Sequence, residues 1–244
     1  MLSEARKRLI FALDVDSSAA AEEWVRRLRG NVGVFKIGKQ LFTRCGPDVV
    51  RMVQDHGSEV FLDLKFHDIP NTVARAAIEA CRLGVRMFNV HALGGRAMMT
   101  EAARAVRECF AAGKERAPLL LGVTILTSSS EQTLREVGIE QPVEEMVVRL
   151  AALAKDAGLG GVVASPREVG LIRRACGSGF SIVTPGVRPS FAETNDQRRI
   201  MTPGEAIAAG SDFLVVGRPI AAADDPVGAA QRIVEEMAAA LERT

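Results

Sequence analysis

Residues 60–91 read VFLDLKFHDIPNTVARAAIEACRLGVRMFNVH, and the fold class can be inferred from them. It begins with one apolar run, Val60–Leu64, and ends with another, Met87–Val90, as expected of strands that are buried on both faces. Between the two runs, small apolar residues recur at the spacing of one helix face, namely Val73, Ala76, Ala77 and Ala80. A strand, a helix and a strand in this order predict two parallel strands joined by a crossover helix.

The same alternation extends outward over the whole chain. The apolar runs are Leu9–Leu13, Val32–Ile37, Val60–Leu64, Met87–Val90, Leu119–Leu126, Gly161–Ala164, Ser181–Thr184 and Phe213–Val216. Helical patterns separate them in strict alternation, and no Pro/Gly/Ser-rich linker interrupts the series. Eight strands and eight helices in 244 residues predict an α/β fold, a single (β/α)₈ TIM barrel domain over residues 1–244.

A doubly wound open sheet is the alternative fold. Such a sheet usually has a glycine-rich nucleotide-binding turn after its first strand. Here the first run is followed by Asp14-Val15-Asp16-Ser17 instead, which favours the barrel.

Composition indicates a protein that handles small molecules in the cytoplasm. The 31 basic and 30 acidic residues are scattered, so no charged block predicts binding to nucleic acid or to a membrane surface. Met1 to Arg8 is too charged for an export signal, and the longest apolar run, Leu119–Leu126, is too short to span a bilayer.

Cysteine and histidine spacing argues against a zinc site and against a disulfide framework. The four cysteines, Cys45, Cys81, Cys109 and Cys176, form no C-x-x-C pair, and the three histidines are equally dispersed. We interpret all four thiols as small core residues, which suits a reducing compartment.

Charged residues stand where the predicted strands end. In a barrel of this kind the active site lies at the carboxyl ends of the strands. The first run ends in Asp14, the second contains Lys36, and the third ends with Asp63 and Lys65. Because side chains alternate along a strand, we expect Asp63 and Lys65 to share a face and to point into the barrel mouth. The alternative is that these two residues only form a buried ion pair.

Glycine and arginine follow the last two runs, where barrels commonly bind phosphate. Gly186 and Arg188 come after the seventh run, and Gly217 and Arg218 come after the eighth. Glycine allows backbone N–H groups to approach an anion, and a guanidinium matches its oxygens. The long polar segment from Arg188 to Arg199 is a candidate lid. The alternative is that these are solvated loop arginines.

With these residues in place, the chain resembles the orotidine 5′-phosphate decarboxylase family of the bacterial type over essentially its whole length. The matching motifs are FALD (Phe11–Asp14), FKIG (Phe35–Gly38), DLKFHDIPNTV (Asp63–Val73), NVHALGG (Asn89–Gly95), LTS (Leu126–Ser128), TPGVR (Thr184–Arg188) and VVGRPI (Val215–Ile220). A D-x-K-x-x-D core is shared by related phosphosugar barrels, whereas the eleven-residue stretch together with the arginine motifs is highly specific.

The resemblance implies a reaction and a role for each matched residue. The reaction is decarboxylation to uridine 5′-phosphate, the last step of de novo pyrimidine synthesis, without metal or organic cofactor. Lys65 is implied as proton donor, Asp63 as the neighbour of the substrate carboxylate, Lys36 as the residue that holds the charges and reaches the ribose, and Asp14 as a ribose ligand. The remaining implied contacts are Thr127 with the base; Arg188, Gln197, Gly217 and Arg218 with the phosphate; and Asp68, Ile69 and Thr72 with the neighbouring subunit's site in a homodimer.

Two other functions fit the same barrel. A phosphosugar lyase or aldolase would depend on magnesium or form a Schiff base at Lys36 or Lys65. A catalytically silent sensor of a phosphoribosyl ligand would have little reason to gather buried charges of alternating sign.

Overall fold

The structure, a computed structural model, describes residues 1–111, 117–189 and 201–243. Within these ranges eight strands pair in chain order and close into a barrel. The strands are β1 (Leu9–Ala12), β2 (Val34–Gly38), β3 (Glu59–Phe66), β4 (Met87–His91), β5 (Leu119–Val123), β6 (Gly161–Val163), β7 (Ser181–Pro185) and β8 (Phe213–Val216). Every predicted apolar run therefore overlaps a strand, the predicted barrel is confirmed, and the open-sheet alternative is wrong.

Helices outnumber the eight that strict alternation predicted. The described α-helices are α1 (Leu2–Arg8), α2 (Ser18–Leu28), α3 (Lys39–Cys45), α4 (Asp48–Asp55), α5 (Pro70–Arg82), α6 (Gly95–Phe110), α7 (Glu131–Glu136), α8 (Val143–Asp156), α9 (Val169–Cys176), α10 (Pro203–Ala208), α11 (Arg218–Ala221) and α12 (Pro226–Leu241). One extra helix arises at Gly46-Pro47, where a left-handed φ of 64° at Gly46 ends α3 and Pro47 precedes α4.

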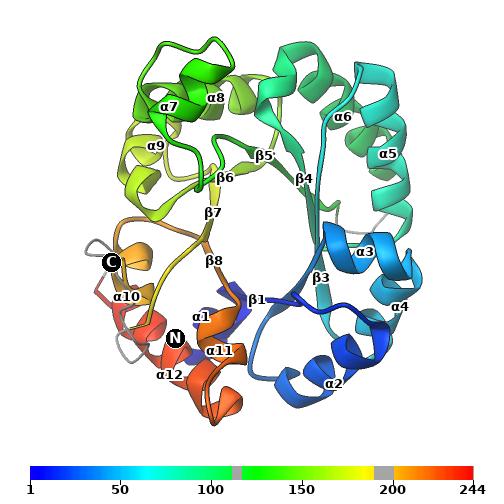
Figure 1. Cartoon of the computed structure of the whole chain (residues 1–244), viewed down its shortest axis with the longest axis vertical. Helices are drawn as coiled ribbons and strands as arrows, with labels where there is room; N and C mark the ends of the chain where they lie inside the picture. The colour runs from blue at the N-terminus through cyan, green and yellow to red at the C-terminus, as the bar shows by residue number, and fades with distance from the viewer. Residues whose placement is uncertain (112–116, 190–200, 244) are drawn as a thin grey trace. The chain divides into compact units, whose positions relative to one another are not determined.

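Contacts within the chain divide it into two compact units. The first unit, Met1–Leu64 and Thr184–Thr244, holds β1, β2, β8 and most of β3. In it Phe11 of β1 pairs in parallel with Phe35 of β2 and with Val216 of β8. The helices α1 and α10 both pack on α12 (Figure 1). The expectation of a single domain over residues 1–244 stays a prediction.

The second unit, Lys65–Val183, holds β4, β5, β6 and the helices from α5 to α9. Asn89 of β4 pairs in parallel with Leu121 of β5, which pairs with Gly161 of β6. The helices α5 and α6 lie side by side (Figure 1). The apolar side of α5, including Val73 and Ala77, is buried, as its helical spacing predicted.

The interpretation of all four cysteines as core residues is wrong for two of them. Cys81 and Cys176 are buried, whereas Cys45 is half-buried and Cys109 is exposed. Burial, with a smaller contribution from the neighbouring Cys109, raises the pKa of the Cys81 thiol to about 12. The Cys81 thiol is therefore protonated at neutral pH. No described helix has the length and apolar character that crossing a membrane requires.

Candidate active site

Three of the predicted charged residues meet in the first unit. Asp14 follows β1, and Lys36 and Asp63 lie on β2 and β3. The register pairs Ala12 with Lys36 and Gly38 with Asp63, so the side chains arrive at the same ends of neighbouring strands. Lys36 Nζ lies 3.3 Å from Asp14 Oδ1 and 3.7 Å from Asp63 Oδ2. We call these three residues the Lys36 group.

The Lys36 group is only partly open to water. The side chains of Lys36 and Asp63 are 12% and 13% exposed, whereas that of Asp14 is 69% exposed. At an effective dielectric of about 20, charges near 4 Å attract by about 4 kcal/mol, before the cost of desolvation. Two carboxylates share one ammonium, so these three side chains carry a net negative charge. Such a group can bind hydroxyls and disfavours a further anion beside Asp63.

The glycine after β8 lies against this group. A Cβ placed on Gly217 would be 3.3 Å from Ala12 Cβ and 3.5 Å from Asp14 Oδ2. The backbone at Gly217 therefore approaches Asp14 closely, and Arg218 begins α11 immediately afterwards with an exposed side chain. Gly217, one of the residues predicted to bind phosphate, thus lies beside Asp14.

The segment after β7 contributes the other predicted phosphate residues. Gly186 has a φ of 82°, in the left-handed region that glycine adopts most readily, and so turns the chain at the end of β7. Arg188 is half-buried, and its backbone N–H donates to Met201 O at 3.1 Å. Gln197 and most of the proposed lid lie outside the described residues.

In the second unit, Lys65 has an unusual backbone. Its φ is 53°, and among the described residues it is the only non-glycine with a positive φ. Its N–H donates to Asn89 Oδ1 at 2.7 Å, and Asn89 is completely buried. The strand β3 extends past this residue to Phe66, and the shared face of Asp63 and Lys65 stays a prediction. The sequence gives no signal for this positive φ, because lysine is not a residue that favours φ above zero.

The loop after Lys65 is exposed. Asp68, Ile69 and Thr72 are all open to solvent at the start of α5, and Ile69 is 66% exposed. The Ile69 N–H donates to Asp68 Oδ1 at 2.6 Å. A large apolar side chain displayed beside a carboxylate is suited to contact with another molecule.

Thr127 is farther from a strand than predicted. The expected strand Leu119–Leu126 ends at Val123, and Thr127 lies in the exposed turn that follows. Just past the strand end, both the N–H and the hydroxyl of Thr124 still donate to Val163 O, at 3.3 and 3.2 Å, so Thr124 is the last residue here with a contact to β6.

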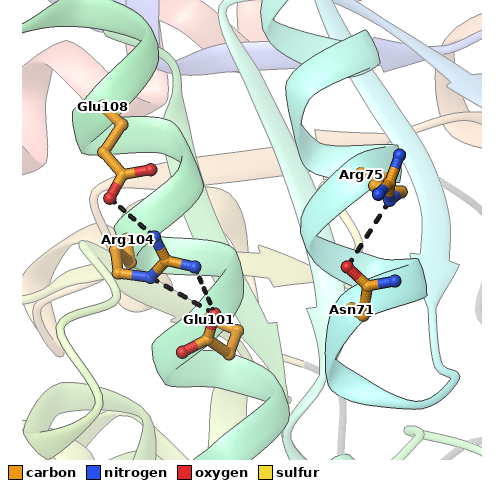
Figure 2. A network of polar contacts seen from close by, with 5 residues as sticks. All are labelled: Asn71, Arg75, Glu101, Arg104 and Glu108. Carbon is orange, nitrogen blue, oxygen red and sulfur yellow. Dashed lines mark hydrogen bonds and ion pairs between the residues drawn. The ribbon is translucent and has the colours of Figure 1, made fainter.

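A second charged cluster lies on the surface of the second unit (Figure 2). On α6, Arg104 donates to Glu101 at 2.6 Å and to Glu108 at 2.7 Å, and on α5 Arg75 donates to Asn71 at 3.4 Å. We call Glu101, Arg104 and Glu108 the Arg104 group. Its hydrogen bond from Arg104 lowers the pKa of Glu101, and the two carboxylates raise the pKa of Arg104.

Metal ligation finds no support in the side chains whose positions are described. Among residues 1–111, 117–189 and 201–243, no three His, Cys, Asp or Glu side chains gather as a metal ion requires. The rings of His67 and His91 pack on each other instead, with their centroids 5.6 Å apart.

Comparison with known proteins gives one consistent match. The model of the orotidine 5′-phosphate decarboxylase / HUMPS family matches residues 7–233. The chain is 86% identical over 242 residues to the orotidine 5′-phosphate decarboxylase of Syntrophotalea carbinolica, covering 99% of each chain. It is 63% identical to that of Geobacter sulfurreducens, covering 97% of this chain and 98% of the relative.

A solved structure agrees with these relatives. The crystal structure of orotidine 5′-phosphate decarboxylase from Lactobacillus acidophilus superposes with a TM-score of 0.84 at 38% identity. The superposition covers 94% of this chain and 98% of that one.

Proposed function

The chain belongs to the orotidine 5′-phosphate decarboxylase / HUMPS family, and on this premise we propose that it is a carboxy-lyase that converts orotidine 5′-phosphate to uridine 5′-phosphate and carbon dioxide. This is the last step of de novo pyrimidine nucleotide synthesis. The observation that carries the proposal is the 86% identity, over 99% of both chains, to a relative with this name.

The reaction breaks the bond between carbon six of the pyrimidine and its carboxylate. Carbon dioxide leaves, the electron pair stays on carbon six, and the Lys65 ammonium gives a proton to that carbon. No neighbouring group of the ring accepts the electron pair, so stabilisation has to come from fixed charges. The proposed chemistry needs no metal or organic cofactor.

Asp63 and Lys36 would set the charge at the reacting carbon. Asp63 would disfavour the substrate carboxylate in the ground state, and this repulsion disappears as carbon dioxide leaves. Lys36 would hold Asp63 in place, which its distance of 3.7 Å supports. Asp14, which also contacts Lys36, would bind the ribose hydroxyls.

Contacts remote from the reacting bond would bind the rest of the substrate. We assign the phosphate to Arg188, Gln197, Gly217 and Arg218, and the base to Thr127. The close approach of the Gly217 backbone to Asp14 supports neighbouring phosphate and ribose contacts. Binding energy from the phosphate can then favour the transition state at the distant carbon.

We further propose that the chain acts as a homodimer in the cytoplasm. Asp68, Ile69 and Thr72 would reach the active site of the neighbouring subunit, where Asp68 would complete a catalytic set of two cations and three anions. The exposure of Ile69 supports this contact, because a dimer would cover it.

The proposed function is tested by following the absorbance of orotidine 5′-phosphate with the purified chain in the presence of a chelator. We expect substrate loss at an unchanged rate. No loss of substrate would refute the proposal, loss only without chelator would favour a magnesium-dependent lyase, and borohydride trapping at Lys36 or Lys65 would favour a Schiff-base aldolase.

Lys65→Ala tests the proton donor. We expect turnover to be abolished, whereas binding of the product uridine 5′-phosphate, measured by calorimetry, stays largely intact because the phosphate contacts remain. If the variant keeps as much as about a tenth of the rate, Lys65 is not the donor.

Mixing two inactive variants tests the shared site. In a heterodimer of Lys65→Ala and Asp68→Ala subunits, one site combines an intact Lys65 with an intact Asp68. An equimolar mixture should therefore recover up to about a quarter of the wild-type activity after subunit exchange. No recovery in a mixture that demonstrably forms heterodimers would contradict an Asp68 shared between subunits.

A further inference from the structure

The backbone of Lys65 is held in a conformation that lysine does not favour. Its φ of 53° places the Cβ close to the following carbonyl oxygen, so the conformation persists only where the surroundings fix it. Glycine would adopt the same conformation without strain, but a proton donor needs a side chain. Some neighbouring group must therefore hold this residue.

Asn89 contacts the backbone N–H of Lys65, next to the N–Cα bond whose rotation is φ. Asn89 Oδ1 accepts the Lys65 N–H at 2.7 Å, which fixes the peptide plane that precedes the Lys65 Cα. Asn89 is 0% exposed and lies in β4 between Phe88 and Val90, which are also 0% exposed, so its own position is tightly constrained.

The residue after Lys65 is anchored to the same strand. The Phe66 ring packs on the Phe88 ring with a centroid distance of 6.2 Å. The chain is thus attached to β4 directly before the Lys65 Cα, through Asn89, and directly after it, through Phe88. These two contacts together set the direction in which the Lys65 side chain leaves the backbone.

We propose that Asn89 is a positioning residue that holds Lys65 in its left-handed conformation and thereby aims the Lys65 ammonium at the reacting carbon. This inference rests on the proposed role of Lys65 as proton donor. Asn89 does not touch the substrate in this proposal and acts on the reaction through the Lys65 backbone.

Two variants of similar size separate the hydrogen bond from the packing. Asn89→Leu removes the acceptor, whereas Asn89→Asp keeps an oxygen in the same place in either protonation state. We expect Asn89→Leu to lower kcat by about tenfold to a hundredfold, with KM within about threefold of wild type, because only the donor is misplaced. The kcat of Asn89→Asp should be at least about fivefold higher than that of Asn89→Leu.

A matched control removes a comparable bond away from the strand ends. Lys155 of α8 donates to the backbone carbonyl of Cys176 at 2.8 Å, in the same unit as Asn89. Lys155→Met should lower the melting temperature and leave kcat unchanged. A crystal structure of Asn89→Leu should show Lys65 outside the left-handed region; if that variant does not fold, Asn89→Ala replaces it.

Three outcomes would overturn the role of Asn89: a kcat of Asn89→Leu within twofold of wild type, equal losses in the Leu and Asp variants, or an unchanged Lys65 φ. These failures differ from failure of the proposed function. Decarboxylation by wild type and its loss in Lys65→Ala test the function, and the φ of Lys65 is measured without any substrate.

Discussion

Two clusters in this chain have the same composition, one basic side chain between two carboxylates, in different surroundings. In the Lys36 group the contacts measure 3.3 and 3.7 Å, and Lys36 and Asp63 are 12% and 13% exposed. In the Arg104 group they measure 2.6 and 2.7 Å, and the three side chains are 38% to 62% exposed (Figure 2). Asp14, at 69%, is the exposed member of the Lys36 group, and the shorter contacts belong to the cluster whose basic side chain is the more exposed, at 50% against 12%.

The difference shows that distance alone does not rank ion pairs. Water screens the Arg104 group, and holding long side chains in one geometry costs entropy, so such pairs contribute little to stability. The Lys36 group is partly desolvated, so each of its charges changes the energy of the others and of any bound ligand. Chemistry is expected at the Lys36 group and not at the Arg104 group.

The two clusters also arise in different ways. Arg104 lies three residues after Glu101 and four before Glu108, which is the spacing that brings side chains together on any helix. Lys36 meets Asp14 and Asp63 only because three strands pair in one register. The second arrangement depends on the fold, which is why breaking it should have the larger effect.

The largest effect is expected from Lys36→Ala. Removing the ammonium leaves Asp63, which is largely buried, beside Asp14 without the cation that they share. In the proposed mechanism Lys36 holds Asp63 at the reacting carbon, so we expect kcat/KM for orotidine 5′-phosphate to fall by about a thousandfold. Steady-state kinetics of the purified variant measure this directly.

Lys39→Ala is the matched control for that variant. Lys39 is an exposed lysine three residues further along the chain, at the start of α3. Its removal should leave kcat/KM unchanged. If kcat/KM of Lys36→Ala falls by less than tenfold, the Lys36 group does not differ in function from the Arg104 group as argued above.

Asp14→Asn should have a smaller effect within the Lys36 group. Asp14 is 69% exposed, so water replaces part of its interaction with Lys36. We expect KM to rise by about tenfold to a hundredfold, with a lesser change in kcat, because a ribose contact is present before and during the reaction.

Asp16→Asn serves for comparison, since Asp16 is an exposed carboxylate two residues further along and has no proposed role. Its KM should match that of wild type. A fall in kcat with unchanged KM in Asp14→Asn would assign Asp14 to the chemical step instead of to ribose binding.

The sequence predicted that charges gather at the strand ends, and the contacts of Lys36 with Asp14 and Asp63 agree with this clustering. Eight apolar runs located the strands, and Asp14, Lys36 and Asp63 were singled out because they end or nearly end three of those runs. This succeeded because strands buried on both faces are almost continuously apolar, so a charge marks the point where burial ends.

Other features could not be predicted because they depend on contacts between distant residues. Nothing near Lys65 in the sequence indicates a positive φ, which is associated with its contact to Asn89, 24 residues away. In the sequence Asn89 stands out only as the first residue of the NVHALGG motif. The exposure of Cys109 was missed because cysteine is usually buried, and that tendency says nothing about one position on α6.

Arg104→Ala should show how little the exposed cluster contributes. We expect the melting temperature to fall by no more than about 2 °C, since exposed helix pairs are weak and screened. Decarboxylase kcat/KM should be unchanged. Arg82→Ala, which breaks the exposed contact between Arg82 and Glu79 at 2.6 Å, should behave in the same way. A larger fall confined to Arg104→Ala would mean that its network stabilises more than exposed pairs do.

The smallest expected effect is on the titration of Glu101. The hydrogen bond from Arg104 lowers the pKa of Glu101 below its ordinary value of 4.5. A carboxyl whose pKa is lower in the folded state stabilises the fold above its unfolded pKa, and this contribution is lost as the pH falls through the folded pKa. The contribution should therefore disappear only below pH 4.5.

Carboxyl-detected NMR should give a Glu101 pKa that returns toward the ordinary value in Arg104→Ala, and also in wild type at high salt, because an exposed pair is screened. An ordinary Glu101 pKa in wild type at low salt would show that the short contact in the Arg104 group has no energetic consequence in solution.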